Sequence, residues 1–303
     1  MSEQPTRQSS PASSEQRAVS RWGQERRLEF IDWRLQWDGR INRADLTAFF
    51  GISVPQASLD IAKYLEMAPS NAVYDRRAKV YLAGPDFQPH FASNTPQRYL
   101  NELHARAAAV LQPELSFMGW APTCDLAPNP GRAVPDSILL PLLRAIRERL
   151  QVDIEYQSMS SALPTHRAIS PHAMAFDGFR WHVRAYCHLR EQFRDFVVAR
   201  MTKATATDRA ALPSDRDESW SRKVKLLLGP NPSLSPAAQR VIELDYGMNG
   251  GHVELECRQA LLFYTLKRLG LLKNDEVTPD SQQIVLLNRN ELEPHLPRSG
   301  EDR

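Results

Sequence analysis

The sequence predicts a multidomain α+β protein with a winged helix-turn-helix in its N-terminal third, a strand-rich middle domain and a C-terminal α/β domain. Three observations lead to this prediction. Helix-capping signals and a basic turn follow one another between residues 20 and 84. Residues 180–188 alternate between apolar and polar side chains, as a strand does. Beyond residue 220, strand-like and helix-like stretches alternate.

Composition limits the class of protein. A length of 303 residues suits two or three domains, and 42% hydrophobic residues suffice for real cores. The net charge of +2 gives no global basic field, so nucleic-acid binding would need a local patch. Cys124, Cys187 and Cys257 are widely spaced without a CxxC pair, which favours reduced thiols.

The N-terminal end carries no targeting signal in this interpretation. No apolar run reaches the ~18 residues of a membrane span, and the first twenty residues have no apolar signal-peptide core. We therefore expect a cytoplasmic protein that does not enter the membrane. Residues 1–19 are rich in Ser, Gln and Pro and are expected to form a disordered tail.

Residues 20–92 are expected to form the winged helix-turn-helix. Apolar residues at Leu28, Ile31 and Leu35 have helical spacing. Asn42 is a typical cap for a second helix, and Gly51 can end that helix in a left-handed conformation. Helix, short helix, tight turn and helix is the order of a helix-turn-helix.

The third helix of this domain is the candidate reader of the DNA major groove. Ser53 and Gln56 form a capping-box pattern that begins it, and it is expected to extend to Met67. Strands at 73–75 and 79–82 flank a basic turn, which makes a wing. The predicted DNA contacts are Ser53, Gln56, Ser58, Lys63, Arg76, Arg77 and Lys79. Asp60 is also expected on or near the open side of this helix. The alternative is a three-helix bundle with a solvated face, because the reading helix has no arginine and Leu59 lies where a polar residue is expected.

The rest of the chain divides by composition. Residues 93–136 are expected to be a connection, with an amphipathic helix at 96–111 followed by a Pro-rich linker. A helix from Ser137 to Leu150 opens the middle domain, 137–207. The C-terminal domain, 220–296, is expected to hold strand 224–228, helix 235–246, strand 252–257 and helix 260–272.

The strand predicted at Arg180–His188 has apolar side chains on one face and polar side chains on the other, because successive side chains point to opposite sides. One face holds Trp181, Val183, Ala185 and Cys187, and the other holds His182, Arg184, Tyr186 and His188. Burying unpaired cations costs free energy, so the second face is expected to meet water or an anionic guest. Clustered arginines suit phosphate, and nearby aromatic rings offer stacking surfaces for a base. The plainer alternative is the solvated side of a two-sided sheet.

A sequence of motifs in this region resembles the WYL domain of bacterial transcriptional regulators, most of all the branch that represses phage-defence operons. The motifs are strand 152–156, Ser158 and Ser160, Arg167 with 170–172, the segment 178–183, Phe196 and Arg200. The family's name triplet stands here as Trp181-His182-Val183.

The resemblance implies a small Sm-like β-barrel with a basic ligand pocket. By position, the pocket residues are Tyr156, Ser158, Arg167, His172, His182, Arg184 and Arg200. Residues beyond 220 resemble the extension that accompanies WYL domains, which implies a role in dimerisation. Ser158 has the alternative of a simple loop residue, and Arg190 and Arg194 that of solvated cations.

Catalysis is not predicted. His182 and His188 are separated by roughly 20 Å along a strand, too far to share one phosphate. The sequence has no metal-ligand spacing and no Gly-rich phosphate loop, so no metal or cofactor is expected.

The sequence as a whole predicts a homodimeric repressor that reads an inverted-repeat operator. Its WYL domain would bind a nucleotide or single-stranded nucleic acid that modulates operator binding. A transcriptional activator of the same architecture, and a processing enzyme acting on RNA or single strands, remain alternatives.

Overall fold

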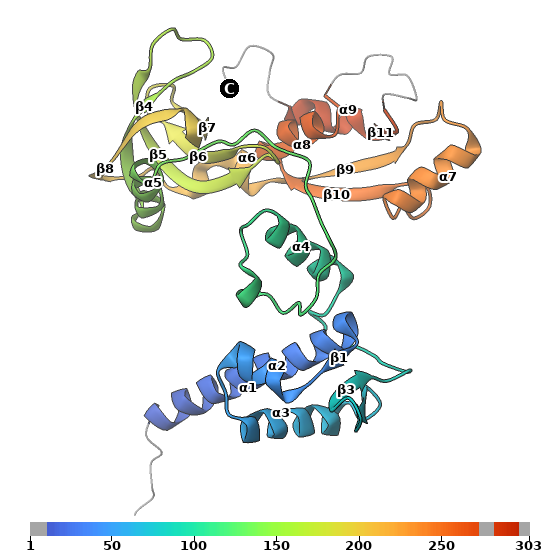
Figure 1. The fold of residues 1–303 in the computed structure, drawn as a ribbon. Helices are drawn as coiled ribbons and strands as arrows, with labels where there is room; N and C mark the ends of the chain where they lie inside the picture. The colour runs from blue at the N-terminus through green and yellow to red at the C-terminus, as the bar shows by residue number, and fades with distance from the viewer. Residues whose placement is uncertain (1–10, 273–281, 297–303) are drawn as a thin grey trace, which may run out of the picture. The chain divides into compact units, whose positions relative to one another are not determined.

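The computed structural model describes residues 11–272 and 282–296, with side chains from residue 22 onward. The chain divides into two compact units, residues 1–128 and 129–303. The first unit holds one hydrophobic core and the second holds two. Figure 1 shows their elements.

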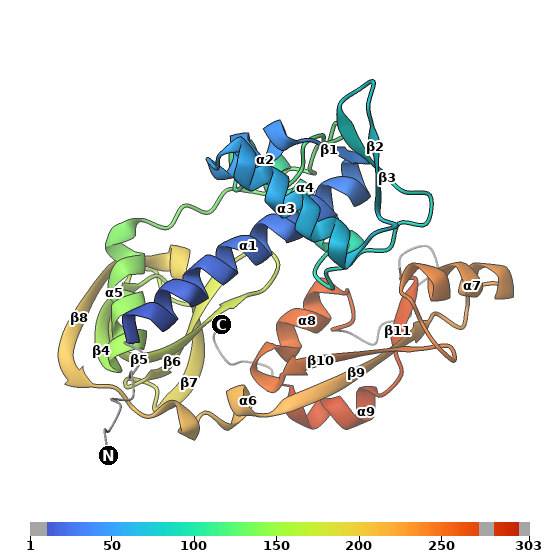
Figure 2. The ribbon, with the colours of Figure 1, turned by 90° about the horizontal axis from the view of Figure 1, so that it is seen from below.

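The N-terminal unit is a winged helix-turn-helix followed by a further helix. Its elements are α1 (Pro11–Asp38), β1 (Arg40–Ile41), α2 (Arg43–Phe50), α3 (Val54–Met67), β2 (Ala72–Asp75), β3 (Val80–Ala83), α4 (Pro96–Ala107) and a 3-10 turn (Pro113–Leu115). The strands form an antiparallel sheet in the order β1-β3-β2. The β2–β3 hairpin, which is the wing, lies beside α3 in both views (Figures 1 and 2).

Local capping chemistry sets the limits of α2 and α3, as predicted. The Asn42 side chain accepts from the Asp45 amide, and the Asp45 carboxylate accepts from the Asn42 amide. Gly51 ends α2 at φ 65°, a left-handed conformation that glycine adopts without steric cost. Ser53 accepts from the Gln56 amide at 3.3 Å and begins α3, but the expected capping box is only half formed, because the Gln56 side chain donates to Asp60 instead. Each signal is local, so the sequence alone reveals it.

Two boundaries differ from the prediction. Helix α1 begins at Pro11, so residues 11–19 are helical where a disordered tail was expected. Proline suits a first helical turn, and Ala, Glu, Gln and Arg in 12–18 favour helix. Helix α4 is part of the N-terminal core rather than a free bridge, because Tyr99 stacks on Trp33 at 6.1 Å between ring centroids and Leu103 joins the same cluster.

The second unit begins with a helix and a five-stranded antiparallel sheet. Its elements are α5 (Asp136–Glu148), β4 (Leu150–Tyr156), β5 (Thr165–Phe176), β6 (Trp181–Cys187), β7 (Gln192–Val197), a 3-10 turn (Val198–Arg200) and β8 (Met201–Ala210). The strand order is β7-β6-β5-β4-β8. No pairing between β7 and β8 closes the sheet in the described residues, so the predicted closed barrel is not confirmed.

The C-terminal part of this unit has the predicted alternation of strand and helix. Its elements are 3-10 turn Ser214–Arg216, α6 (Glu218–Ser221), β9 (Lys223–Pro230), α7 (Pro236–Asp245), β10 (Val253–Arg258), 3-10 turn Gln259–Leu261, α8 (Leu262–Arg268), β11 (Ile284–Leu286), α9 (Arg289–Leu292) and 3-10 turn Glu293–His295. The strands pair antiparallel in the order β10-β9-β11. Leu226 and Leu228 of β9 are buried against Leu262 and Leu266 of α8 in one core.

Strand β6 shows why one face was predicted correctly and the other was not. Val183, Ala185 and Cys187 are fully buried in the core under α5, as expected. His182 and Arg184, on the opposite face, are also buried. The middle of strand β6 is therefore covered on both sides, while Tyr186 and His188 are half-buried. Trp181, expected on the core face, is 53% exposed at the start of the strand.

Candidate nucleic-acid interface and polar cluster

The N-terminal unit presents exposed cations on and beside α3. Lys63 lies on the open side of α3, where its ammonium pairs with Glu66 at 3.0 Å. Arg76, Arg77 and Lys79 are exposed in the wing turn. Among the residues that the structure describes, those three wing cations have no ion-pair partner. Their charges are therefore available to an anion such as a phosphate.

The wing turn is held in shape by its own backbone. The Asp75 carboxylate accepts from the amides of Arg77 and Ala78, at 2.8 and 3.0 Å. Lys79 has φ 56°, the left-handed conformation that lets the chain reverse into β3. The turn thus presents its cations from a fixed loop rather than a free one.

The other predicted contacts on α3 are engaged within the protein. Ser53 is the helix cap, and the Ser58 hydroxyl donates to the Val54 carbonyl at 3.0 Å. The Gln56 amide donates to Asp60 at 3.1 Å. Asp60, expected near the open side, is fully buried because Arg27 of α1 pairs with it at 2.6 Å. As base contacts, Gln56 and Ser58 stay predictions.

In the second unit, Arg184 lies at the centre of a buried ionic cluster. Its guanidinium donates to both oxygens of Asp217, at 2.7 and 3.0 Å, and to Asp195 at 3.3 Å. The His172 imidazole contacts Asp217 at 3.0 Å. Asp217 itself also accepts from the Trp220 amide at 3.1 Å, which caps α6.

His182 has a carboxylate partner of its own. Its Nε2 lies 3.0 Å from Asp177, which also accepts from Arg180 at 3.0 Å. The His182 ring packs against Tyr264 of α8, with 4.8 Å between ring centroids. Residues of the C-terminal part therefore cover this end of β6.

These contacts correct part of the predicted ligand set. His172, His182 and Arg184 were expected to line an open basic face, and they are instead buried in ion pairs with acidic partners. Of those partners, Asp177 and Asp195 lie close in sequence to β6, whereas Asp217 is 33 residues beyond Arg184. Strand periodicity reports which side chains share a face, but it does not report what later covers that face.

The hydrogen bonds of the cluster change its acid–base behaviour. Burial alone raises the pKa of Asp217, but hydrogen bonds from His172 and Arg184 outweigh burial and lower this pKa to about 2, from an ordinary 3.8. Burial also raises the pKa of Asp177, and hydrogen bonds from His182 and from backbone amides outweigh burial and lower this pKa below the usual range. Burial and hydrogen bonding act in opposite senses on Arg184, and the bonds to Asp217 raise its pKa.

A pH dependence of stability follows from Asp217. Its folded pKa lies below its unfolded pKa, so its contribution is fully present above pH 3.8 and is lost as the pH falls through about 2. We expect urea unfolding curves to show a loss of roughly 2 kcal/mol in this range from this group. The Asp217→Asn variant should lose less stability between pH 5 and pH 2, and parallel curves for the two proteins would contradict this assignment.

The remaining predicted ligand residues gather at the end of β4. The Arg167 guanidinium lies 5.5 Å from the centre of the Tyr156 ring and 5.9 Å from that of Phe196. Tyr156 is buried, and its hydroxyl accepts from the Val197 amide at 3.2 Å. The Arg200 carbonyl accepts from the Gln157 amide at 3.0 Å. Gln157 precedes Ser158 in the chain, so the backbone of Arg200 lies near Ser158. Tyr156, Ser158, Arg167 and Arg200 are thus neighbours, separate from the buried cluster.

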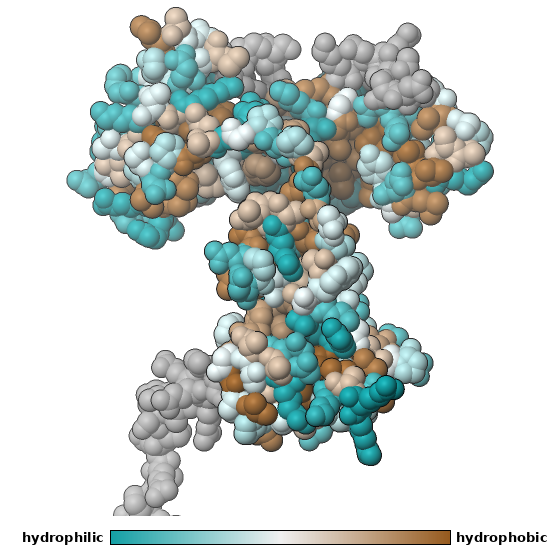
Figure 3. Space-filling view, in the orientation of Figure 1, coloured by the Kyte–Doolittle hydropathy of each residue, from teal (hydrophilic) through white to brown (hydrophobic). Residues whose placement is uncertain are grey.

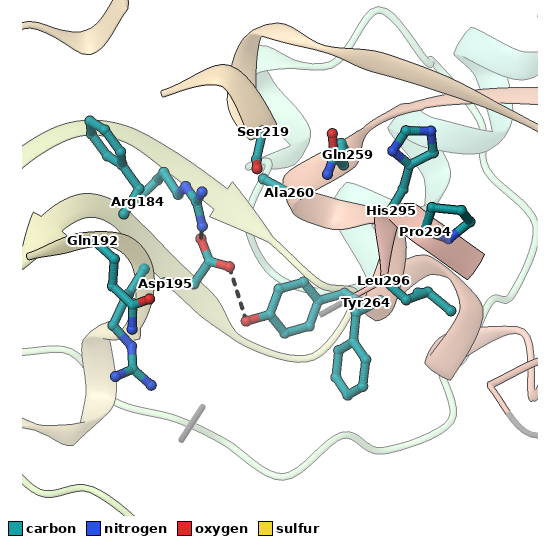
Figure 4. A pocket seen from close by; sticks show the side chains of 13 residues that line it. Arg184, Gln192, Asp195, Ser219, Gln259, Ala260, Tyr264, Pro294, His295 and Leu296 are labelled. Atoms are coloured by element: carbon teal, nitrogen blue, oxygen red, sulfur yellow. Dashed lines mark hydrogen bonds and ion pairs between the residues drawn. The ribbon is translucent and has the colours of Figure 1, made fainter. Parts of the chain in front are cut away.

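A cavity of about 220 Å³ adjoins the buried cluster. Figure 4 shows Asp195 of β7 accepting from both Arg184 and Tyr264, which join strands β6 and β7 to helix α8 across the cavity wall. Gln192 and Arg194 on one side and Gln259 and His295 on the other complete a mainly polar lining. The sheet and the C-terminal part therefore share both this cavity and a chain of hydrogen bonds.

The described residues offer neither a metal-binding cluster nor a membrane-spanning helix. No group of three or more His, Cys, Asp or Glu side chains there is arranged to hold a metal ion. No helix in the same part of the chain is long and apolar enough to cross a membrane.

Each of three regions of the chain matches a known protein domain. Residues 23–105 match the BrxR transcriptional regulator winged helix-turn-helix domain, residues 137–206 match the WYL domain, and residues 223–292 match the BrxR transcriptional regulator C-terminal dimerization domain. A solved structure, proteasome accessory factor B/C of Arthrobacter aurescens, aligns with 82% of this chain and 43% of its own. Its TM-score is 0.26 at 15% identity, too low to assign a fold.

Several curated relatives share nearly the whole chain. The DNA-binding transcriptional repressor CapW of Stenotrophomonas maltophilia is 47% identical, over 90% of this chain and 92% of the relative. CapW of Pseudomonas aeruginosa is 45% identical and CapW of Escherichia coli 42% identical, each over 92% of this chain and 94% of the relative. With three matching domains and this identity, the chain belongs to the family of WYL-domain transcriptional regulators that includes BrxR and CapW.

Proposed function

We propose that this protein is a sequence-specific, DNA-binding transcriptional repressor, without enzymatic activity, that acts as a homodimer on an inverted-repeat operator. The observation that carries the proposal is the winged helix-turn-helix, whose wing exposes Arg76, Arg77 and Lys79 beside α3. The relatives of this chain are named as DNA-binding repressors. The match of residues 223–292 to a dimerization domain supports the two-fold arrangement that an inverted repeat requires. We propose that the genes under this operator form a phage-defence operon.

In vitro selection from a random duplex library with the full chain tests this function. The expected result is enrichment of one motif repeated in inverted orientation, with half-sites about one helical turn or a multiple apart. A reporter under that operator should be silenced when the protein is expressed. Binding without sequence enrichment, or activation of the reporter, would contradict the proposal.

We further propose that Ser158, Arg167 and Arg200 contact an anionic effector, a nucleotide or a single-stranded nucleic acid, and that the buried Tyr156 ring supports Arg167 from below. A guanidinium group held over aromatic rings can pair with a phosphate of the effector. Arg167 lies over two such rings. His172, His182 and Arg184 would act behind this surface, since their polar atoms are already paired with Asp177, Asp195 and Asp217.

Arg167→Ala tests the effector surface. A labelled single-stranded DNA oligonucleotide is the probe, followed by fluorescence anisotropy. Loss of one charge-assisted hydrogen bond should weaken its binding more than about tenfold, while affinity for the operator duplex stays the same. Arg190→Ala, at an exposed position in the β6–β7 turn, is the matched control. Equal probe binding by both variants would mean that Arg167 does not contact the effector.

A further inference from the structure

The exposed face of α3 carries several apolar side chains. Leu59 is 64% exposed and Val54 56% exposed, and Pro55 and Ala62 are also exposed. These four residues, the apolar stripe, lie within the first nine residues of α3 at positions that share one side of a helix, with the half-buried Ser58 between Val54 and Ala62. In the space-filling view, hydrophobic atoms interrupt the hydrophilic surface along the edge of the N-terminal unit where α3 runs (Figure 3).

The polar residues of this part of α3 are already engaged. Gln56 donates to the buried Asp60, and the Ser58 hydroxyl donates to a carbonyl one turn earlier. The Ser58 hydroxyl has one proton, so donating it to a base would break this internal bond, whereas Gln56 keeps its second amide N–H and its oxygen. The apolar stripe, by contrast, is exposed and can contact a binding partner.

The charges around the apolar stripe indicate which molecule covers it. Lys63 lies on the same helix, and the wing beside α3 exposes Arg76, Arg77 and Lys79. Cations flanking an apolar strip suit duplex DNA, because phosphates line the edges of the major groove while the thymine C5-methyl group is the apolar feature of its floor. A second protein chain offers no reason for the exposed cations of the wing.

We propose that the apolar stripe reads thymine methyl groups in the major groove of the operator, with Leu59 as the specificity-determining residue. The inference rests on the proposed function and adds to it the chemical group that is recognised. It also accounts for a leucine at a position where a polar side chain was expected.

Replacing thymine by uracil in the operator duplex removes the methyl group and leaves base pairing unchanged. The duplex selected in vitro is remade with one uracil at a time, and binding of the full chain is measured by mobility shift. At one or more thymines in each half-site, the wild type should lose about fourfold in affinity, the value of one buried methyl group. Leu59→Ala should bind the thymine and uracil duplexes equally at that position.

Leu189→Ala is the matched control, because Leu189 is 60% exposed in the second unit. This variant should keep the full preference for thymine. Wild-type protein that binds the operator but makes no distinction between thymine and uracil would overturn the inference and leave the proposed function intact. The same holds if Leu59→Ala keeps the preference. Wild-type protein that binds no duplex would overturn both.

Discussion

Replacing Arg76 and Arg77 together with alanine is expected to weaken binding to the operator and to unrelated duplexes by the same factor. Both side chains are exposed in a turn that Asp75 holds rigid, so they suit contacts with phosphates rather than bases. Each phosphate contact contributes about 0.9 to the slope of log affinity against log salt, so the slope should fall by about 1.8. Mobility-shift titrations at several salt concentrations measure both quantities.

The control for this experiment changes the same charge elsewhere. Arg132 and Arg240 are exposed and lie outside the winged helix-turn-helix, so their double alanine variant should keep the affinity and the salt slope of the wild type. Equal losses in the two double variants would mean that net charge, and not the wing, determines binding.

Replacing Arg184 with methionine is expected to destabilise the protein by about 3–5 kcal/mol, the effect of leaving a buried carboxylate without its partner. Arg184 is 7% exposed and holds Asp217 by two hydrogen bonds and Asp195 by a third. The variant leaves two carboxylates near His172 without their main counter-charge. Urea unfolding at pH 7 measures the loss of free energy.

Two further variants distinguish the ionic cluster from a general effect of losing a cation. Lys225 pairs with Glu254 at 2.9 Å on the surface and its side chain is 62% exposed, so Lys225→Met should leave the free energy of unfolding nearly unchanged. Adding Asp217→Asn to Arg184→Met removes one unpaired charge and should restore part of the stability. A loss for Arg184→Met no larger than that for Lys225→Met would contradict the role assigned to the cluster.

Much of the fold could be predicted because its signals are local. Asn42, Gly51 and Ser53 mark helix ends through contacts with residues at most four positions away. The two strands of the wing were predicted at 73–75 and 79–82, and the alternation in residues 180–188 predicted strand β6. The resemblance to WYL domains rested on the order of such short motifs, and the matches of residues 137–206 and 223–292 confirm it.

The candidate site was harder to predict because its partners are distant in sequence. Asp60 and Arg184 each find their buried ion-pair partner 33 residues away, in α1 and at the start of α6. A polar residue on an amphipathic pattern looks solvated until such a partner is known, so both were placed on open faces. Leu59 shows the opposite case, since an exposed apolar residue was visible in the sequence as an anomaly, and the structure confirms that it is exposed.

Hydrogen–deuterium exchange of the full chain, with and without the selected operator duplex, tests the central claim most directly. The account predicts that the duplex slows exchange of amides in α3 and in the wing turn, residues 54–67 and 75–80. Slower exchange confined to the sheet of residues 150–210, with α3 and the wing unchanged, would contradict the claim that the N-terminal unit reads DNA.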